Sequence, residues 1–165
     1  MQKNIVIYPT SANPPTWGHA DILNRAAKMF EKVYWTAANN PGKSLAFSLE
    51  ERLSMMQDYV QYYKLTNVVI DHFEGATIRY AMEKEAGFIL RGLRSTSDFH
   101  FELELATGNR GIDKEVETIC MFAKPHFATL SSTLVRELAM LDEKITQYVL
   151  PSVAEKVYRG LKKRE

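Results

Sequence analysis

Short apolar runs alternate with longer amphipathic stretches along almost the whole chain. Runs rich in β-branched and aromatic residues are typical of buried strands, and five of them occur. The predicted strands are Asn4 to Tyr8, Lys32 to Ala38, Val68 to Ile70, Phe88 to Leu90 and Val116 to Phe122. Pro9 is expected to end the first strand, because a loop rich in Thr, Ser, Asn and Pro follows it.

Apolar positions at helical spacing fill the stretches between these strands and the region after the last one. The predicted helices are Gly18 to Phe30, one that begins after Ser48, Thr77 to Glu85, Ser97 to Asn109, Ser132 to Leu141 and one that follows Pro151. Ser48 and Glu51 match the capping-box pattern at a helix start. Ser152 and Glu155 match it as well, so we expect this second box to open the last helix.

The regular alternation of strand and helix predicts right-handed crossovers and a parallel sheet. We therefore expect a single-domain, Rossmann-like α/β fold over residues 1–165. Its five-stranded parallel sheet would carry helices on both faces, and the last helices would form a C-terminal extension. Ligands of such sheets bind beyond the carboxyl ends of the strands, so the strand-to-helix loops should hold the chemistry.

The composition argues for a protein with one core and against a general binder of nucleic acid or membranes. The chain has 165 residues, 45% of them hydrophobic, which suffices for one sizeable core. Its formal net charge of +1 lacks the basic excess typical of nucleic-acid or membrane binding. The sequence shows no signal-peptide pattern and no long apolar run, so a cytoplasmic protein is expected. The one cysteine, Cys120, lies in the apolar fifth strand and is expected to be a buried, inert thiol.

Two common nucleotide signatures do not fit. The loop after the first strand lacks G-x-G-x-x-G, which argues against a dinucleotide-binding dehydrogenase. Gly42-Lys43-Ser44 resembles the end of a phosphate-binding P-loop, but Ala37 stands where that motif needs its first glycine.

Thr16-Trp17-Gly18-His19 lies at the expected start of the first helix. A helix N-terminus presents free N–H groups and partial positive charge, which suit a phosphate, and Gly18 leaves room for a nucleotide near the backbone. His19 would face the phosphates and is expected to be neutral, because the helix dipole disfavours an imidazolium. The alternative is that Thr16 only caps the helix and His19 is a surface histidine.

This loop resembles the T-x-G-H signature of the nucleotidyltransferase superfamily. Further segments resemble the bacterial phosphopantetheine adenylyltransferases: Lys43, Phe47 to Arg52, Leu90 to Arg94, Asp98 to Ala106, Asn109-Arg110 and Leu130 to Glu137. The family loop after Tyr-Pro usually reads G-[ST]-F-D-P, whereas this chain has Thr10-Ser11-Ala12-Asn13-Pro14 and differs at three of these positions. Gly75, Ala76 and Thr77 are also smaller or more polar than the usual family residues.

The resemblance implies transfer of AMP from ATP to 4′-phosphopantetheine, which yields dephospho-coenzyme A and pyrophosphate. It implies catalytic roles for His19 and Lys43. The residues it places on ATP are Thr16, Gly18, His19, Arg94, Glu102, Leu130, Ser131, Ser132 and Thr133. Those it places on the acceptor are Ser11, Lys43, Thr77, Arg91, Asn109 and Glu137. Cations and N–H donors suit this chemistry, because negative charge develops on the transferred phosphate and on the pyrophosphate.

Mg²⁺ would arrive with ATP, since the sequence offers no obvious metal-ligand cluster. The resemblance also implies a homo-oligomer, in the form of a hexamer. The open alternatives are nucleotidyl transfer to another acceptor such as nicotinate mononucleotide, cytidylyl transfer, and a non-catalytic paralog that binds nucleotide or coenzyme A.

Simpler structural roles are also open for several of these residues. Arg91 and Arg94 could pair with surface carboxylates, and the Ser131 to Thr133 run could be only a helix cap. The other histidines are expected to be solvent-facing or structural: His72, His100 and His126.

Overall fold

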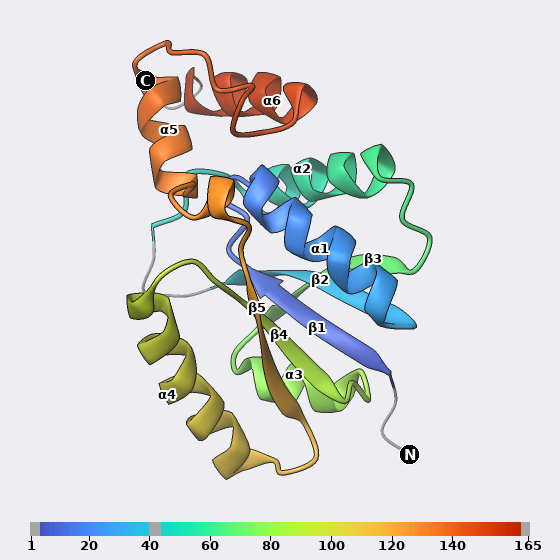
Figure 1. The fold of residues 1–165 in the computed structure, drawn as a ribbon. Helices are drawn as coiled ribbons and strands as arrows, with labels where there is room; N and C mark the ends of the chain where they lie inside the picture. The colour runs from blue at the N-terminus through green and yellow to red at the C-terminus, as the bar shows by residue number, and fades with distance from the viewer. Residues whose placement is uncertain (1–3, 40–43, 163–165) are drawn as a thin grey trace.

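The computed structural model describes residues 4–39 and 44–162, and its centre is a five-stranded sheet (Figure 1). The strands are β1 (Ile5–Thr10), β2 (Lys32–Asn39), β3 (Val68–Glu74), β4 (Phe88–Leu93) and β5 (Glu117–Phe122). They lie in the order β3-β2-β1-β4-β5, and every neighbouring pair is parallel. The predicted five-stranded parallel sheet is confirmed.

Helices cover both faces of this sheet, as predicted (Figure 1). The helices are α1 (Trp17–Met29), α2 (Leu49–Tyr62), α3 (Thr77–Glu83), α4 (Thr96–Ile112), α5 (Ser132–Met140) and α6 (Pro151–Lys162). α1 and α2 lie on one face, and α3 and α4 lie on the other. α5 and α6 pack against each other, and α6 also packs on α2, which confirms the helical C-terminal extension.

The two faces of the sheet bury separate apolar layers, because successive side chains of a strand point to opposite sides. Val6 and Tyr8 belong to the larger layer, which the sheet shares with α1, α2, α5 and α6. Ile7 belongs to the smaller layer beneath α3, together with Ile78 and Ile89. The β1 strand therefore contributes to both cores and fixes the centre of the fold.

The fold has a switch point between β1 and β4. These strands are neighbours in the sheet, yet the helices that follow them, α1 and α4, cover opposite faces. A crevice opens at the carboxyl ends of strands related in this way. The topology therefore places a ligand site beyond Thr10 of β1 and Leu93 of β4.

The predicted end of the first strand at Pro9 is wrong. β1 continues to Thr10, and Pro9 pairs in register with Thr36 of β2. The ladder between β1 and β4 covers only Val6 and Ile7 of β1, so no hydrogen bond on that side needs an N–H from residue 9. The Pro9 carbonyl instead accepts a hydrogen bond from Arg91 Nη1 at 3.3 Å.

The two predicted capping boxes have different outcomes. Ser48 Oγ accepts the Glu51 N–H at 3.2 Å and Glu51 Oε2 accepts the Ser48 N–H at 2.9 Å, so the first box is confirmed. The second is wrong, because α6 already begins at Pro151. Ser152 lies inside its first turn and donates to Asp58 Oδ2 of α2 at 2.8 Å.

The expectation of a buried Cys120 is also wrong, because its side chain is exposed. β5 is an edge strand, and the neighbouring α4 buries only Glu102 among its 17 residues. An apolar strand sequence therefore did not ensure burial at this edge of the sheet.

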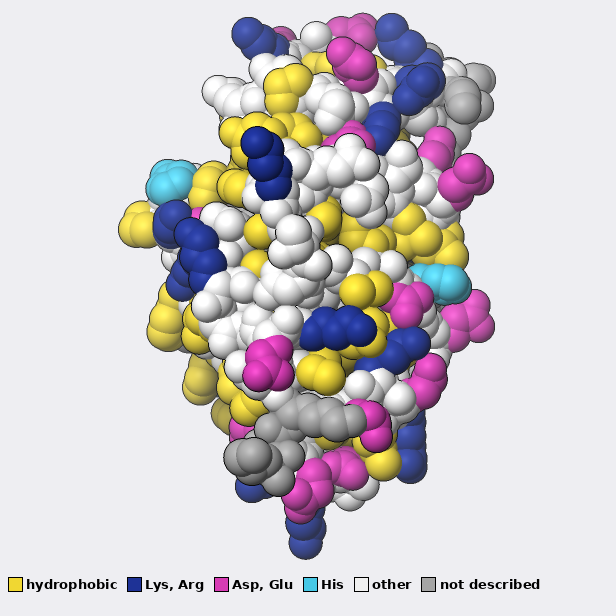
Figure 2. Space-filling model, turned by 90° about the vertical axis from the view of Figure 1, so that its right-hand side faces the viewer, with side chains coloured by type: hydrophobic (Ala, Val, Ile, Leu, Met, Phe, Trp, Pro, Cys, Tyr) yellow, Lys and Arg dark blue, Asp and Glu magenta, His cyan; other side chains and the backbone are white. Residues whose placement is uncertain are grey.

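Charged side chains of both signs are interspersed on the face of the molecule that Figure 2 shows, and neither sign gathers into a patch there. Among the described residues, no helix has the length and apolar character needed to span a membrane.

Gly160 allows α6 to approach Phe47 closely. A Cβ atom at this position would lie 2.8 Å from Phe47 Cε1, whereas one at Gly111 near the end of α4 would meet nothing within 4 Å. We expect Gly160→Ala to lower the free energy of unfolding by about 1–3 kcal/mol through overpacking, although alanine favours helix. Urea denaturation measures this change. Gly111→Ala is the control and should be neutral or slightly stabilising; equal effects of both substitutions would contradict the packing role.

Candidate active site

A cavity of about 330 Å³ opens at the switch point between β1 and β4. The end of β1, the start of α1, the end of β4 and the segment before α5 form its walls. All nine residues predicted to contact ATP line this cavity: Thr16, Gly18, His19, Arg94, Glu102, Leu130, Ser131, Ser132 and Thr133. Ser11, predicted to contact the acceptor, also lines it. Residues from three distant parts of the sequence, 8–22, 91–102 and 123–133, therefore meet where the topology predicts a ligand site.

A second cavity of about 250 Å³ lies between α4 and the sheet. Three of the predicted acceptor residues line it: Thr77, Arg91 and Asn109. Arg91 and Glu102 line both cavities, so this pair forms the boundary between them. The small residues Gly75 and Ala76 form part of the second cavity's wall.

Two predicted acceptor residues are not placed in these cavities. Glu137 lies on an exposed part of α5 and lines neither cavity. Lys43, predicted to act in catalysis and in acceptor binding, lies outside the described residues.

His19 is held by the residue that caps its own helix. The Thr16 N–H donates to His19 Nδ1 at 3.1 Å, so the imidazole takes the place that glutamate holds in a capping box. Because Nδ1 accepts this hydrogen bond, the proton of the neutral ring lies on Nε2. His19 therefore has its Nε2–H left to donate to a ligand.

The neutral state of His19 follows from its surroundings. Burial, and then the positive charge of Arg94, lower its pKa from 6.5 to about 4. A lowered pKa agrees with the expectation of a neutral His19. The causes differ from the expected one, because burial and Arg94 lower the pKa here, whereas the sequence analysis invoked the helix dipole. A neutral imidazole can donate from Nε2 without the cost of burying a charge.

The start of α1 also serves purely structural needs. Thr16 occupies the N-cap position, as the simpler interpretation expected. The Trp17 N–H donates to the Tyr148 carbonyl at 3.0 Å, so this group is not free for a phosphate. A Cβ at Gly18 would lie 3.5 Å from Thr16 Oγ1 and 3.7 Å from Phe127 Cβ, which are ordinary contacts. The fold alone therefore does not require glycine at residue 18.

Arg91 forms a two-pronged ion pair with Glu102. Its Nε lies 2.5 Å from Glu102 Oε2, and its Nη2 lies 2.8 Å from Oε1. The Glu102 side chain is only 8% exposed, so Arg91 does pair with a carboxylate, but with a buried one. Glu102 and the Pro9 carbonyl use three of the five guanidinium N–H groups. One N–H on each Nη atom remains for a ligand.

Arg94 joins two walls of the larger cavity. Its Nη1 donates to the Leu130 carbonyl at 2.9 Å, and its Nε lies 3.3 Å from Asp98 Oδ2. This Asp98 contact is the carboxylate pairing that the simpler interpretation expected for Arg94. After burial, the positive charge of this guanidinium is the second cause that lowers the pKa of His19.

The serine run before α5 fulfils its capping role and also ties two loops together. Ser131 is the N-cap of α5, and its Oγ accepts the Leu134 N–H at 3.1 Å. Ser132 Oγ donates to the Pro14 carbonyl of the first loop at 2.7 Å. Arg136 Nη2 donates to Thr133 Oγ1 at 3.2 Å. The Ser132 bond holds the hydroxyl-rich wall against the loop that follows β1.

The residues that depart from the family loop have local partners. Thr10 Oγ1 accepts a hydrogen bond from Trp35 Nε1 at 3.0 Å in the core. Asn13 Oδ1 accepts the N–H groups of Ala46 and Phe47 at 3.0 and 3.2 Å. Ala12 adopts a left-handed backbone, with φ of 47°, where a glycine would be less strained. The altered loop is thus held by hydrogen bonds to β2 and to the segment before α2.

Sequence reasoning missed Arg52. Its side chain is buried, and Nη1 donates to the carbonyls of Ser11 and Ala38 at 3.0 and 3.3 Å. It therefore joins the loop after β1 to the end of β2. The sequence signals were its position within the apolar stripe of α2, between Leu49 and Met56, and its place in the family-like segment Phe47 to Arg52.

The sequence is similar to those of known proteins. Residues 7–138 match the family described as cytidylyltransferase-like. The phosphopantetheine adenylyltransferase of Legionella pneumophila (strain Lens) is 41% identical over 163 residues, which cover 99% of this chain and 92% of that protein. The enzyme of the same name from Synechococcus elongatus is 39% identical over 152 residues, which cover 92% and 90%.

Solved structures show the same fold. A putative nicotinate-nucleotide adenylyltransferase from Vibrio parahaemolyticus has a TM-score of 0.73 at 18% identity, covering 99% of this chain and 97% of that one. A Plasmodium falciparum nicotinic acid mononucleotide adenylyltransferase has a TM-score of 0.69 at 14% identity and covers 95% of each chain. Identities this low are evidence of fold alone.

The match over residues 7–138 and the cavity at the switch point define a nucleotidyltransferase of the cytidylyltransferase-like class. The near-full-length identity to curated relatives is more specific. The chain belongs to the phosphopantetheine adenylyltransferase family.

The protonation state of His19 can be measured directly by ¹⁵N NMR of the imidazole. We expect the Nε2–H tautomer at pH 7 and a titration midpoint near 4, because burial and Arg94 lower the pKa. Since the unfolded chain binds this proton near pH 6.5, the stability that neutral His19 contributes should fall as pH drops from about 6.5 to 4. His19→Asn should flatten that part of the stability curve. A midpoint at or above 6.5, or a proton on Nδ1, would contradict the geometry.

Proposed function

We propose that the protein transfers AMP from ATP to 4′-phosphopantetheine and releases pyrophosphate. It acts in coenzyme A biosynthesis as a pantetheine-phosphate adenylyltransferase, and residues 1–165 form one nucleotidyltransferase domain. The observation that carries this proposal is the pair of adjoining cavities that meet at Arg91, in a chain of this family. The larger cavity is proposed for ATP and the smaller one for the acceptor, so the reacting phosphates would meet at the boundary that the cavities share.

The reaction joins an acceptor phosphate oxygen to the α-phosphorus of ATP and breaks the bond to the departing pyrophosphate. The acceptor phosphate is already an anion, so no enzymic base has to remove a proton from it. Negative charge develops on the equatorial oxygens and on the leaving group, and preorganised donors stabilise it. His19 Nε2–H is the described donor at the start of α1, and Lys43 is proposed as a second one.

The larger cavity is proposed to hold ATP. Thr16 and Gly18 form its floor at the start of α1, and the lack of a side chain at Gly18 suits close approach of phosphate oxygens to the backbone. Arg94 supplies a cation on the opposite wall, beside Leu130, and the hydroxyl groups of Ser131 and Thr133 supply donors there. Ser132 gives its hydroxyl proton to the Pro14 carbonyl, so its backbone N–H at the start of α5 is its proposed donor. Glu102 is proposed to contribute on the nucleotide side while it holds Arg91.

The smaller cavity is proposed to hold the pantetheine arm of the acceptor. Arg91 would bind the acceptor phosphate through the N–H groups that Glu102 and Pro9 leave free. Thr77 and Asn109 line the same cavity and offer hydrogen bonds to amide groups of the arm. Ser11 and Lys43 are proposed at the phosphate end, and Glu137 is proposed at the entrance.

Mg²⁺ is proposed to enter with ATP. Within residues 4–39 and 44–162, no three His, Cys, Asp or Glu side chains gather in a way that could hold a metal ion. The carboxylates that line the larger cavity, Asp98 and Glu102, are paired with Arg94 and Arg91. Phosphate oxygens would therefore hold the ion, which neutralises part of the triphosphate charge.

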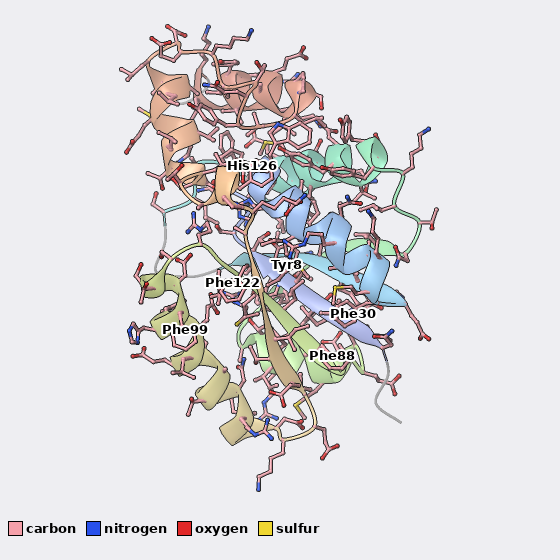
Figure 3. All side chains as sticks on the ribbon, viewed as in Figure 1. Tyr8, Phe30, Phe88, Phe99, Phe122 and His126 are labelled. Carbon is pink, nitrogen blue, oxygen red and sulfur yellow. The ribbon has the colours of Figure 1, made fainter. Side chains whose placement is uncertain are left out.

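A homo-oligomer is proposed from the surface of α4, and its proposed form, a hexamer, rests on the family resemblance. Large apolar side chains are exposed there and at the end of β5: Phe99, Phe101, Leu103, Leu105, Ile112 and Phe122. Phe99 lies on α4 and Phe122 lies at the end of β5 (Figure 3). A surface this apolar is typical of an interface, and a second copy of the chain is the proposed partner.

The proposed partners are thus ATP, 4′-phosphopantetheine and further copies of the chain. Neither nucleic acid nor a membrane is proposed as a partner, because the net charge of +1 gives no general attraction to either. The proposed location is the cytoplasm, where the substrates of coenzyme A biosynthesis occur.

Pyrophosphate release with Mg-ATP tests this function, with 4′-phosphopantetheine, nicotinate mononucleotide or no acceptor in parallel. We expect release only with 4′-phosphopantetheine. His19→Ala should lower kcat by about 100- to 1,000-fold, the scale for one preorganised donor. His72→Ala is the control, because His72 is exposed on β3 and should leave kcat unchanged. Release only with nicotinate mononucleotide would overturn the acceptor assignment.

Arg91 and Arg94 should differ in their kinetic effects, because Arg91 lines both cavities and Arg94 lines only the larger one. We expect Arg91→Ala to raise the KM for the acceptor more than the KM for ATP. Arg94→Ala should raise mainly the KM for ATP. Initial-rate kinetics with each substrate varied in turn measures both effects. Equal changes in the two KM values for both variants would contradict the assignment of separate cavities.

Phe101 is 56% exposed on α4 and should lie in the proposed interface. Phe101→Glu should lower the molar mass in solution, because a charge in an apolar interface is costly. Light scattering after size-exclusion chromatography measures this mass. Met29→Glu on α1 is the control, since Met29 is equally exposed but lies on the other side of the sheet. A monomeric wild-type protein would contradict the oligomer.

A further inference from the structure

The segment from Ala123 to Leu130 forms one wall of the larger cavity, but it contains little regular structure. Ala123, Phe127 and Leu130 line the cavity, and the segment includes only the short 3₁₀ helix Pro125–Phe127. Its far end is fixed by the bond from Arg94 to the Leu130 carbonyl. The Ala123 N–H donates to the Leu93 carbonyl at 2.8 Å, which holds the near end on β4, so the position of this end against α1 depends on a separate set of contacts.

A buried carboxylate on α1 supplies those contacts. The Asp21 side chain is only 7% exposed, and its Oδ1 lies 2.6 Å from Lys124 Nζ. Its Oδ2 lies 3.2 Å from Arg25 Nη1, which donates to the Phe122 carbonyl at 2.8 Å. Asp21 therefore contacts the segment directly through Lys124. It also holds Arg25 in place to bind the carbonyl of Phe122, the residue before the segment.

The same helix carries the proposed catalytic donor. His19 lies two residues before Asp21, so α1 holds the donor at its start and the wall segment about half a turn further on. Phe127 lies beside Gly18 at the start of α1, where a Cβ on Gly18 would be 3.7 Å from Phe127 Cβ. The position of the segment along α1 therefore sets how far His19 lies from the hydroxyl groups at Ser131.

We propose that Asp21 is a positioning residue for ATP, which acts through Lys124 by fixing the Ala123 to Leu130 wall against α1. This inference rests on the proposed function, because it takes the larger cavity to be the ATP site. A buried carboxylate attracts its cation more strongly than an exposed one does, since water screens the pair less. Lys124 is half-exposed, so its loss should loosen the wall without leaving a gap in the core.

The test compares Lys124→Met, Asp21→Asn and the double variant. Lys124→Met should raise the KM for ATP by about tenfold, equivalent to about 1.4 kcal/mol, and change the acceptor KM by less than about twofold. Asp21→Asn should act in the same direction. The double variant should be little worse than Asp21→Asn alone, because both changes remove one shared interaction. Lys124→Arg keeps the charge and should keep the KM for ATP within about twofold.

Lys156→Met is the matched control. Lys156 forms an ion pair of similar length, 2.7 Å, with the largely buried Asp58, and this pair joins α6 to α2 away from the cavity. Its loss should lower the free energy of unfolding and leave both KM values unchanged. If Lys124→Met left the KM for ATP unchanged, or raised both KM values equally, the positioning role would be wrong.

Equilibrium dialysis with ATP separates this proposal from the proposed function. A weaker ATP Kd in Lys124→Met, in a protein that releases no pyrophosphate with phosphopantetheine, would support the positioning role and overturn the proposed function. Normal turnover with an unchanged ATP Kd in Lys124→Met would support the proposed function and overturn the positioning role. Failure of the wild-type protein to bind ATP would overturn both.

Discussion

The site depends on the early divergence of β1 from β4. β1 pairs with β2 along all six of its residues, but it pairs with β4 only at Val6 and Ile7. Pro9 suits this divergence because it has no N–H that would go unpaired on the open side. Arg91 enters the opening and donates to the Pro9 carbonyl, which places its guanidinium between the two cavities.

Two buried carboxylates then organise the cations around this opening. Glu102 orients Arg91, and Asp21 holds Lys124 and Arg25 against α1. Because Glu102 accepts two hydrogen bonds from Arg91, the remaining guanidinium N–H groups of Arg91 are fixed in direction before a ligand binds. His19 stays neutral in this positive environment, because burial and Arg94 both lower its pKa. A donor that is already oriented costs little reorganisation when phosphate charge develops.

The sequence predicted the order and type of the elements, because hydrophobic periodicity is a local property that burial imposes. It also predicted that T-x-G-H and the basic residues around the end of β4 lie near one another, and they line the cavity at the switch point. It missed features that depend on a partner distant in sequence. Pro9 looked like a strand end because the short ladder between β1 and β4, which needs no N–H from residue 9, was unknown. Cys120 looked buried because its strand was not known to be at an edge. The buried roles of Asp21 and Arg52 likewise depend on residues far along the chain.

The most direct test of the account is a crystal structure of the protein with a non-hydrolysable ATP analogue and 4′-phosphopantetheine bound together. The account predicts the triphosphate at the start of α1, between His19 and the Ser131 to Thr133 wall. It predicts the acceptor in the cavity beside Thr77 and Asn109, with its phosphate on Arg91. A triphosphate bound in that smaller cavity, or an acceptor phosphate remote from Arg91, would contradict it.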